Sequence, residues 1–242
     1  MKKVLAIALA LGLAVTAAYA GPMGPVKPTM GRFGLEFEIA SDQRDMEWSS
    51  NAADKSRAEN LYFLGRGTYG LTDKVELTVR LGGASMDEVN KADVGNDTEE
   101  TFNGSTEFAW GLGIAGILYD AGTWNIAGNA NYLAHSGHDG TITPNVSLTA
   151  SNQDFDYSEW QIGLQVQGKY DQFLPYLGVK YSDATLDYNK YNGATGRADS
   201  ESDNNVGVYV GAGFDLTPQW SGYVEGRFVD ETSFGGGIRY TF

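Results

Sequence analysis

Ten segments of this chain alternate apolar and polar side chains residue by residue, and this period-two pattern is the strongest constraint on its fold. The clearest segment is 157–170, in which Trp160 and Ile162 alternate with Glu159 and Gln161. Successive side chains of a β-strand point to opposite faces, so each segment predicts a strand with one apolar and one polar face. The ten predicted strands are 31–40, 59–70, 75–85, 105–119, 123–135, 157–170, 175–182, 205–216, 219–229 and 233–242.

The polar faces decide where the apolar faces must lie. A soluble sandwich or lipocalin-like barrel would bury its apolar faces and expose its polar ones. Here the polar faces carry Glu, Arg, Lys, Gln and Asn among many glycines, which is too hydrophilic for a packed core, so the apolar faces are expected to meet lipid. The sequence therefore predicts an all-β protein, a transmembrane antiparallel up-and-down β-barrel. An interfacial girdle of aromatic residues beside the short turns agrees with it: Tyr69, Trp124, Tyr170, Trp220 and Phe242.

The connections between the predicted strands alternate in length. Four are short turns, and four are long: 41–57, 86–104, 136–156 and 183–204. Tight periplasmic turns and long external loops produce this alternation in barrels. The connection 230–232 is short, and we interpret it as a small external loop. Ten strands is the favoured count. Eight strands is the alternative if 31–40 or the hairpin around 230–232 is misread, although the loss of one strand alone would break the even count.

The N-terminal 20 residues have the pattern of a secretory signal peptide. Lys2 and Lys3 precede a short apolar run, and the run ends in the small-x-small sequence of Ala18 and Ala20. We therefore predict a signal peptide at 1–20, a periplasmic N-terminal tail at 21–30 and an outer-membrane β-barrel at 31–242. The prolines in 21–30 predict that the tail is extended and flexible.

The C-terminal sequence carries a resemblance to a known group. A terminal aromatic residue, alternating apolar residues and a glycine near the end resemble the C-terminal assembly signal of outer-membrane barrels, here Gly237, Ile238, Tyr240 and Phe242. With segments such as 110–116 and 175–181, the chain resembles the small outer-membrane β-barrel domain group, which includes opacity-type and OmpA-like barrels. The resemblance covers most of 31–242 and implies a location in the outer membrane of a Gram-negative bacterium. Because the group has no shared active site, it implies no activity.

The polar faces place six acids and six bases in the predicted lumen, a balance that suggests cross-strand ion pairs. A ten-stranded barrel is only slightly wider than the eight-stranded kind that side chains fill. A plugged interior that only stabilises the barrel is favoured, and a narrow water-filled path for small solutes is the alternative, because glycines leave room on one wall. The predicted lumen-lining residues are Glu36, Glu38, Arg66, Glu76, Arg80, Glu107, Glu159, Lys169, Lys180, Glu225, Arg227 and Arg239.

The long loops are acidic. Loop 86–104 carries six acids and one lysine, and loop 183–204 carries Asp199, Glu201 and Asp203 at alternate positions. Their spacing lacks the glycine and terminal glutamate of a calcium loop, so we predict solvated acidic loops, no metal site and no cofactor. The formal net charge of −14 disfavours nucleic acid as a partner. The expected partners are outer-membrane lipid, lipopolysaccharide and, during insertion, the barrel-assembly machinery, with an extracellular ligand unidentified.

The sequence offers little support for an enzyme. Its two histidines, His135 and His138, lie near Ser136 and Asp139 at the expected external rim. Catalytic triads normally assemble residues that are distant in sequence, and neighbouring residues of a strand point to opposite faces. We therefore predict a non-catalytic outer-membrane protein with a structural or surface-interaction role through its acidic loops. A narrow, porin-like pore for small solutes is the alternative, and a surface hydrolase is the least favoured reading.

Overall fold

The computed structural model describes residues 21–48, 51–91, 99–144, 151–190 and 198–242, with the strand ends at 48, 51–56, 88–91, 99–103, 140–144, 151–154, 188–190 and 198–202 described as backbone only. The elements are all strands: β1 (Phe33–Trp48), β2 (Asn51–Gly70), β3 (Val75–Lys91), β4 (Glu99–Asp120), β5 (Trp124–Pro144), β6 (Ser151–Gly168), β7 (Phe173–Lys190), β8 (Ala198–Ser202), β9 (Val206–Asp215), β10 (Trp220–Phe228) and β11 (Thr232–Thr241). None of the described residues forms a helix that is long and apolar enough to cross a membrane.

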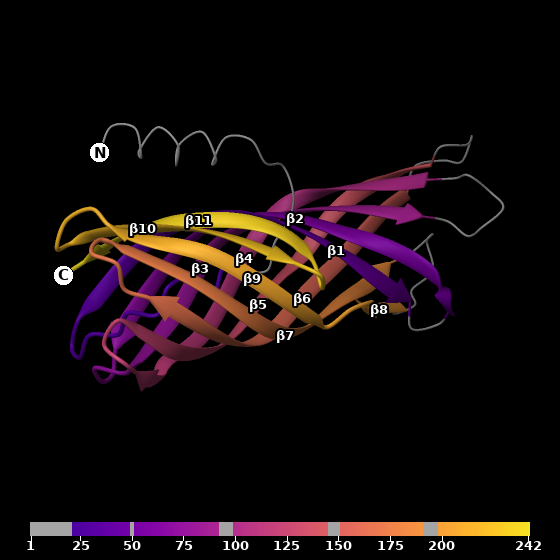
Figure 1. Cartoon of the computed structure of the whole chain (residues 1–242). Helices are drawn as coiled ribbons and strands as arrows, with labels where there is room; N and C mark the ends of the chain where they lie inside the picture. Colours follow the sequence, from indigo (N-terminus) through magenta and orange to yellow (C-terminus); the bar gives the residue numbers. More distant parts are fainter. Residues whose placement is uncertain (1–20, 49–50, 92–98, 145–150, 191–197) are drawn as a thin grey trace, which may run out of the picture.

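Ten of these strands close into a barrel. Each pairs antiparallel with the next strand of the wall, and β11 pairs with β1 from Gly34↔Thr241 to Gln43↔Thr232, which closes the ring (Figure 1). The predicted ten-stranded antiparallel barrel is confirmed, and the eight-stranded alternative is wrong because 31–40 and the hairpin around 230–232 both belong to the wall. Both the C-terminus and the short turns lie at one end of the barrel.

The wall is uneven in height at the opposite end. Strands β9, β10 and β11 contain 10, 9 and 10 residues, whereas β1 to β7 contain between 16 and 22. Above the three short strands, β8 pairs with β7 through Thr185↔Glu201 and with β1 through Met46↔Ser202. β8 therefore bridges β1 and β7, the two tall strands on either side of the three short ones.

The strands continue beyond the predicted ends. Most of the predicted long loops at 41–57, 86–104, 136–156 and 183–204 are strand extensions, so those loop predictions are wrong over most of their length. The physical reason is that the apolar alternation marks only the part of a strand that has an apolar face. Beyond it the backbone hydrogen bonds continue while outward side chains, such as Asp45 and Asp87, become polar.

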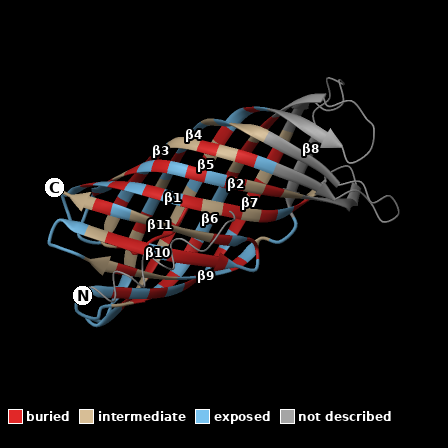
Figure 2. Cartoon of the chain, turned by 90° about the horizontal axis from the view of Figure 1, so that it is seen from above, coloured by how far each residue is buried: buried red, intermediate tan, exposed pale blue. Residues whose placement is uncertain are grey.

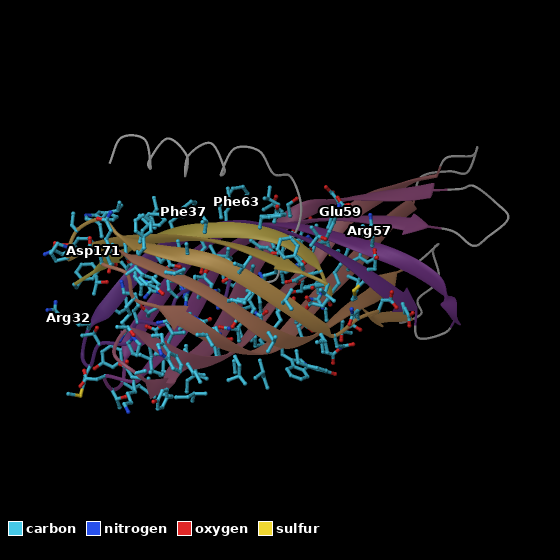
Figure 3. The ribbon with its side chains drawn as sticks, in the orientation of Figure 1. Arg32, Phe37, Arg57, Glu59, Phe63 and Asp171 are labelled. Carbon is cyan, nitrogen blue, oxygen red and sulfur yellow. The ribbon has the colours of Figure 1, made fainter. Side chains whose placement is uncertain are left out.

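Side chains alternate between the two faces along every tall strand (Figure 2). On β1, Phe37 and Ile39 are exposed while Glu36 and Glu38 are buried. In Figure 3, Phe37 and the β2 residue Phe63 project from the outer surface. The large exposed side chains are therefore apolar, and the polar ones point inward.

Exposed aromatic residues form two belts on the outer face. The predicted belt beside the short turns is exposed at all five positions, from Tyr69 to Phe242. A second belt lies nearer the other end, at Phe108, Trp110, Tyr132, Trp160 and Tyr181. Trp160 on β6 and Tyr170, two residues beyond the end of that strand, are ten residues apart in sequence. At about 3.3 Å per residue and a tilt of about 40°, this gives an apolar band of roughly 25 Å. This matches the apolar band of outer-membrane barrels.

The prediction of a free, flexible tail at 21–30 is wrong for most of its length. Residues 21–26 are buried inside the barrel, and only Thr29 and Met30 are exposed near the short turns. The segment finds hydrogen-bond partners on the inner wall that the sequence did not connect to it.

Leu164 on β6 tests the lipid-facing assignment, because it is half exposed and lies between the two aromatic belts. Leu164→Arg is expected to lower the free energy of unfolding by about 2–4 kcal/mol, since a charge on the lipid face costs most near the bilayer midplane. The measurement is urea unfolding in lipid vesicles, with Leu164→Val as the control. An arginine variant as stable as the valine variant would contradict a lipid-facing position.

Candidate functional site

The barrel interior gathers most of the charged residues predicted to line it. Ten of the twelve are buried, and two are not. Glu107 is partly buried near the external end and accepts a hydrogen bond from Ser105. Lys169 is exposed at the short-turn end, where its Nζ lies 3.2 Å from Asp120. The position of Lys169 corrects the prediction: it follows the end of β6, beyond the wall ladder that would direct it inward.

Residues 21–28 occupy the half of the interior next to the short turns. Both oxygens of the Glu225 carboxylate accept backbone amides, from Met23 at 3.0 Å and from Gly24 at 2.9 Å. Gln167 makes a two-point contact with Val26, accepting its N–H at 3.0 Å and donating to its carbonyl at 2.8 Å. The segment is therefore anchored to the wall through its backbone.

Three further wall side chains donate to carbonyl groups of the segment. Gln161 donates to Gly21, Gln165 to Gly24 and Arg80 to Pro22, at 2.9, 3.3 and 2.8 Å. Buried backbone groups without hydrogen-bond partners are costly. These three bonds provide partners for the carbonyl groups of Gly21, Pro22 and Gly24.

The segment's side chains have their own contacts. Met23 packs against Tyr176 and Tyr209, and Val26 packs against Ala115 and Ala127. At the short-turn end, Lys27 forms an ion pair with Asp215. The fit thus involves side chains as well as backbone.

An ion network surrounds this segment. Glu38 contacts Arg66 at 3.2 Å and Arg80 at 2.9 Å, and Glu36 contacts Arg239 at 2.7 Å. Arg66 also lies 3.3 Å from Glu36, and Arg239 lies 3.8 Å from Glu76. Tyr223 donates to Glu38 at 2.8 Å. Because these charges come from both sides of the β1–β11 seam, they join the ends of the barrel wall.

A second, fully buried cluster lies beyond the segment. It joins three acids and three bases, and we call it the upper charge cluster: Arg44, Glu159, Lys180, Arg227, Asp230 and Glu231. Glu231 lies 2.6 Å from both Arg44 and Lys180 and 2.9 Å from Arg227. Asp230 and Glu231 belong to the β10–β11 connection, which turns inward after Val229 adopts a positive φ of 89°.

Nearer the external end, apolar side chains from opposite walls meet. Met46, Met86 and Phe155 pack in one buried cluster, which we call the apolar cap, with Ala58, Tyr157, Ala184 and Leu186. Since these residues come from β1, β2, β3, β6 and β7, the cap spans the lumen. The charge cluster and the cap therefore fill the interior above the segment.

His135 and His138 are buried beside this cap. Tyr62 Oη lies 3.0 Å from His135 Nε2, and His135 Nδ1 lies 2.5 Å from His138 Nε2. Both rings point inward because a bulge at Gly137, where φ is 80°, shifts the register between Ser136 and His138. Ser136 is exposed, on the face opposite His135.

A cavity of about 630 Å³ opens at the short-turn end, and we call it the vestibule. Val26, Lys27 and Pro28 are among the residues that line it and form its floor. Two small cavities, one beside Gly21 and one beside Pro25, have volumes of about 10 Å³ each, close to the volume that one water needs.

Sequence reasoning missed four members of the interior: Asp42, Arg44, Asp230 and Glu231. For the first two a signal existed, because the even-numbered inward positions of β1 continue past Ala40. For the other two no local signal existed, since they belong to a connection and not to a strand. The C-terminal positions Ile238 and Phe242 lie on the outer face, and their role as an assembly signal stays a prediction.

A closed ladder, an apolar outer face and a polar interior define a ten-stranded outer-membrane β-barrel. Residues 89–242, more than half of the chain, match the outer membrane protein beta-barrel domain family, and the chain belongs to that family.

Known relatives are distant. The major outer membrane porin of Chlamydia psittaci is 24% identical over 197 residues, which cover 62% of this chain and 49% of the relative. That of Chlamydia abortus is 25% identical over 114 residues, covering 36% and 29%. The chain thus spans about half or less of the curated relatives it matches. Among solved structures, the Escherichia coli outer membrane protease OmpT gives a TM-score of 0.47 at 14% identity, covering 91% of this chain and 100% of that one. Pseudomonas aeruginosa OprG gives 0.41 at 12% identity, covering 89% and 98%.

Arg44 tests the upper charge cluster. Arg44→Met is expected to lower the free energy of unfolding by about 3–5 kcal/mol, because it removes the arginine that pairs with the buried Glu159 and one of the three bases around Glu231. The matched control is Arg57→Met, which removes an ion pair with Asp45 at the partly exposed external end and is expected to cost less than about 1 kcal/mol. Equal effects of the two substitutions in urea unfolding would contradict the cluster's burial.

Proposed function

We propose that this protein is a non-catalytic, non-conducting outer-membrane barrel with a structural or surface-interaction role. The observation that carries the proposal is the filled interior. Residues 21–28, the upper charge cluster and the apolar cap occupy successive levels of the lumen. Displacing any one of them leaves the other two in the path of a solute.

The external ends of the tall strands supply the interaction surface of this proposal. Among the described side chains there, acids outnumber bases. Arg57 is basic, and the acids are Asp45, Glu59, Asp87, Asp139, Asp156, Asp183, Asp187 and Asp203. Figure 3 places Arg57 and Glu59 away from the short-turn end marked by Arg32 and Asp171. The acids Asp93 and Asp97 lie outside the described residues, as do the side chains of Asp199 and Glu201. An acidic rim favours cationic partners, or lipopolysaccharide bridged by divalent cations.

A narrow pore for small solutes is the second candidate. The similarity to two proteins named as major outer membrane porins favours it. A surface hydrolase is the least favoured, because Ser136 and His135 point to opposite faces and both histidine rings are buried. In either case the chain would act in the outer membrane.

Planar-bilayer recording separates the first two candidates. The refolded full chain, with folding confirmed by a heat-dependent shift in gel mobility, is expected to give no discrete conductance steps, because the interior is filled at three levels. The variant Arg80→Ala is expected to be equally silent, since it leaves the upper charge cluster and the apolar cap in place. Discrete steps that change in size with Arg80→Ala would support the pore instead.

We also propose that the chain is exported by a signal peptide cleaved after Ala20. The buried position of Gly21, beside a small cavity lined by Glu159 and Gln161, is consistent with a short N-terminal group there. Mass spectrometry of the protein from the outer-membrane fraction is expected to identify Gly21 as the first residue. A mature protein that retains residues 1–20 would contradict the cleavage.

A further inference from the structure

The inner wall around residues 21–28 has the features of a peptide-binding site. Five wall side chains make seven hydrogen bonds to backbone groups of the segment, and each of the five is buried. They are Arg80 on β3, Gln161, Gln165 and Gln167 on β6, and Glu225 on β10. Without a peptide, Glu225 would keep the hydrogen bond from Tyr176 and Gln165 the one from Tyr209. The seven bonds to backbone groups would be lost, and buried polar atoms that lose a partner are costly.

The segment is separate from the wall that holds it. Residues 21–29 take part in no β-ladder, although all of them are described, and the ten-stranded ring closes through strands that begin at Phe33. Their contacts with the interior are those made by side chains of the wall. The segment is therefore bound as a ligand is bound. In the cleaved protein proposed above, its covalent link to the barrel would be at its C-terminal end.

The residue types of the segment fit the partners that the wall offers. The N–H groups of Met23, Gly24 and Val26 donate to carboxylate or amide oxygens. Positions 22 and 25 are prolines, which have no N–H that needs an acceptor. Gly24 has a positive φ of 71°, and a Cβ there would lie 3.2 Å from Arg66 Nη1. Proline also lowers the conformational entropy lost when a chain becomes ordered.

The charge of the barrel interior also favours a peptide as the occupant of this site. Among the side chains that the structure describes, eight acids and six bases are buried, an excess of two acids. A peptide brings N–H donors to Glu225, and an N-terminal ammonium at Gly21 would lie beside the small cavity lined by Glu159. An extended peptide with a free amino end matches this interior.

We propose that the half of the lumen next to the short turns is a binding site for an extended, proline- and glycine-rich peptide, which residues 21–28 fill in cis. This inference rests on the proposed function, in which the upper charge cluster and the apolar cap keep the barrel closed to solutes whether or not the peptide site is filled. A peptide enters amino end first through the 630 Å³ vestibule, whose floor is formed by Val26, Lys27 and Pro28.

The test uses the full chain with a protease recognition sequence inserted between the exposed residues Thr29 and Met30. The folded barrel in detergent micelles is cut, and a synthetic peptide of residues 21–28 with a dye at its C-terminal end is added. Fluorescence anisotropy is expected to show saturable binding to the cut barrel and none to the uncut barrel, whose own segment occupies the site. A chain lacking residues 21–30, folded with the labelled peptide present, is expected to retain it.

The matched control peptide exchanges the residues at positions 22 and 23, so that Pro stands at 23. It has the same composition, but it lacks the N–H that Glu225 accepts, and it is expected to bind at least about tenfold more weakly. Glu225→Gln in the barrel is expected to weaken the native peptide, whereas Glu107→Gln, away from the segment, is expected to leave it unchanged.

Several outcomes would overturn the inference. They are failure of the peptide to bind either the cut or the shortened barrel, and equal binding of the native and exchanged peptides. Bilayer recording of the same uncut barrel keeps the two proposals apart. A conducting uncut barrel contradicts the proposed function, while a silent barrel that binds no peptide contradicts only the peptide site.

Discussion

The antiparallel pairing of β1 with β11 is the constraint on which the rest of the structure depends. Lipid offers no hydrogen bonds, so a sheet can span it only when its last edge is paired. Closure then sets the environment of the strand side chains: within the membrane, one face of each strand contacts lipid and the other faces a narrow interior. Glu36, opposite Arg239 across this seam, shows the coupling directly, because the residues that close the ladder also form an ion pair inside.

A closed ten-stranded wall leaves an interior that must be filled with satisfied polar groups. Ion pairs across the lumen meet part of this need, but Glu225 and Gln167 find their partners on the backbone of residues 21–28. The N-terminal segment and the polar wall therefore depend on each other. The same contacts that stabilise the interior also occupy it, which is the physical basis of the proposal that the barrel is closed.

The external half of the barrel is built differently from the half next to the short turns. The tall strands continue past the apolar band as β-ribbons, β8 bridges the low section of the wall, and the connection after Val229 turns inward to complete the upper charge cluster. The apolar cap then seals the lumen with side chains from five strands. Exposed acids at this end, such as Asp87 and Asp203, give the external surface a negative charge.

The local alternation of side chains was enough to predict the ten strands of the closed wall and the face on which most of their residues lie, because Phe37 must point away from the face of Glu38. Extending that alternation would also have found Asp42 and Arg44. Three features could be known only from the folded chain: residues 21–28 lie inside, Asp230 and Glu231 turn inward, and a bulge puts His135 and His138 on one face. Those positions depend on contacts between residues far apart in sequence, such as Met23 with Glu225, or on a single backbone dihedral, and neither leaves a periodic pattern to detect.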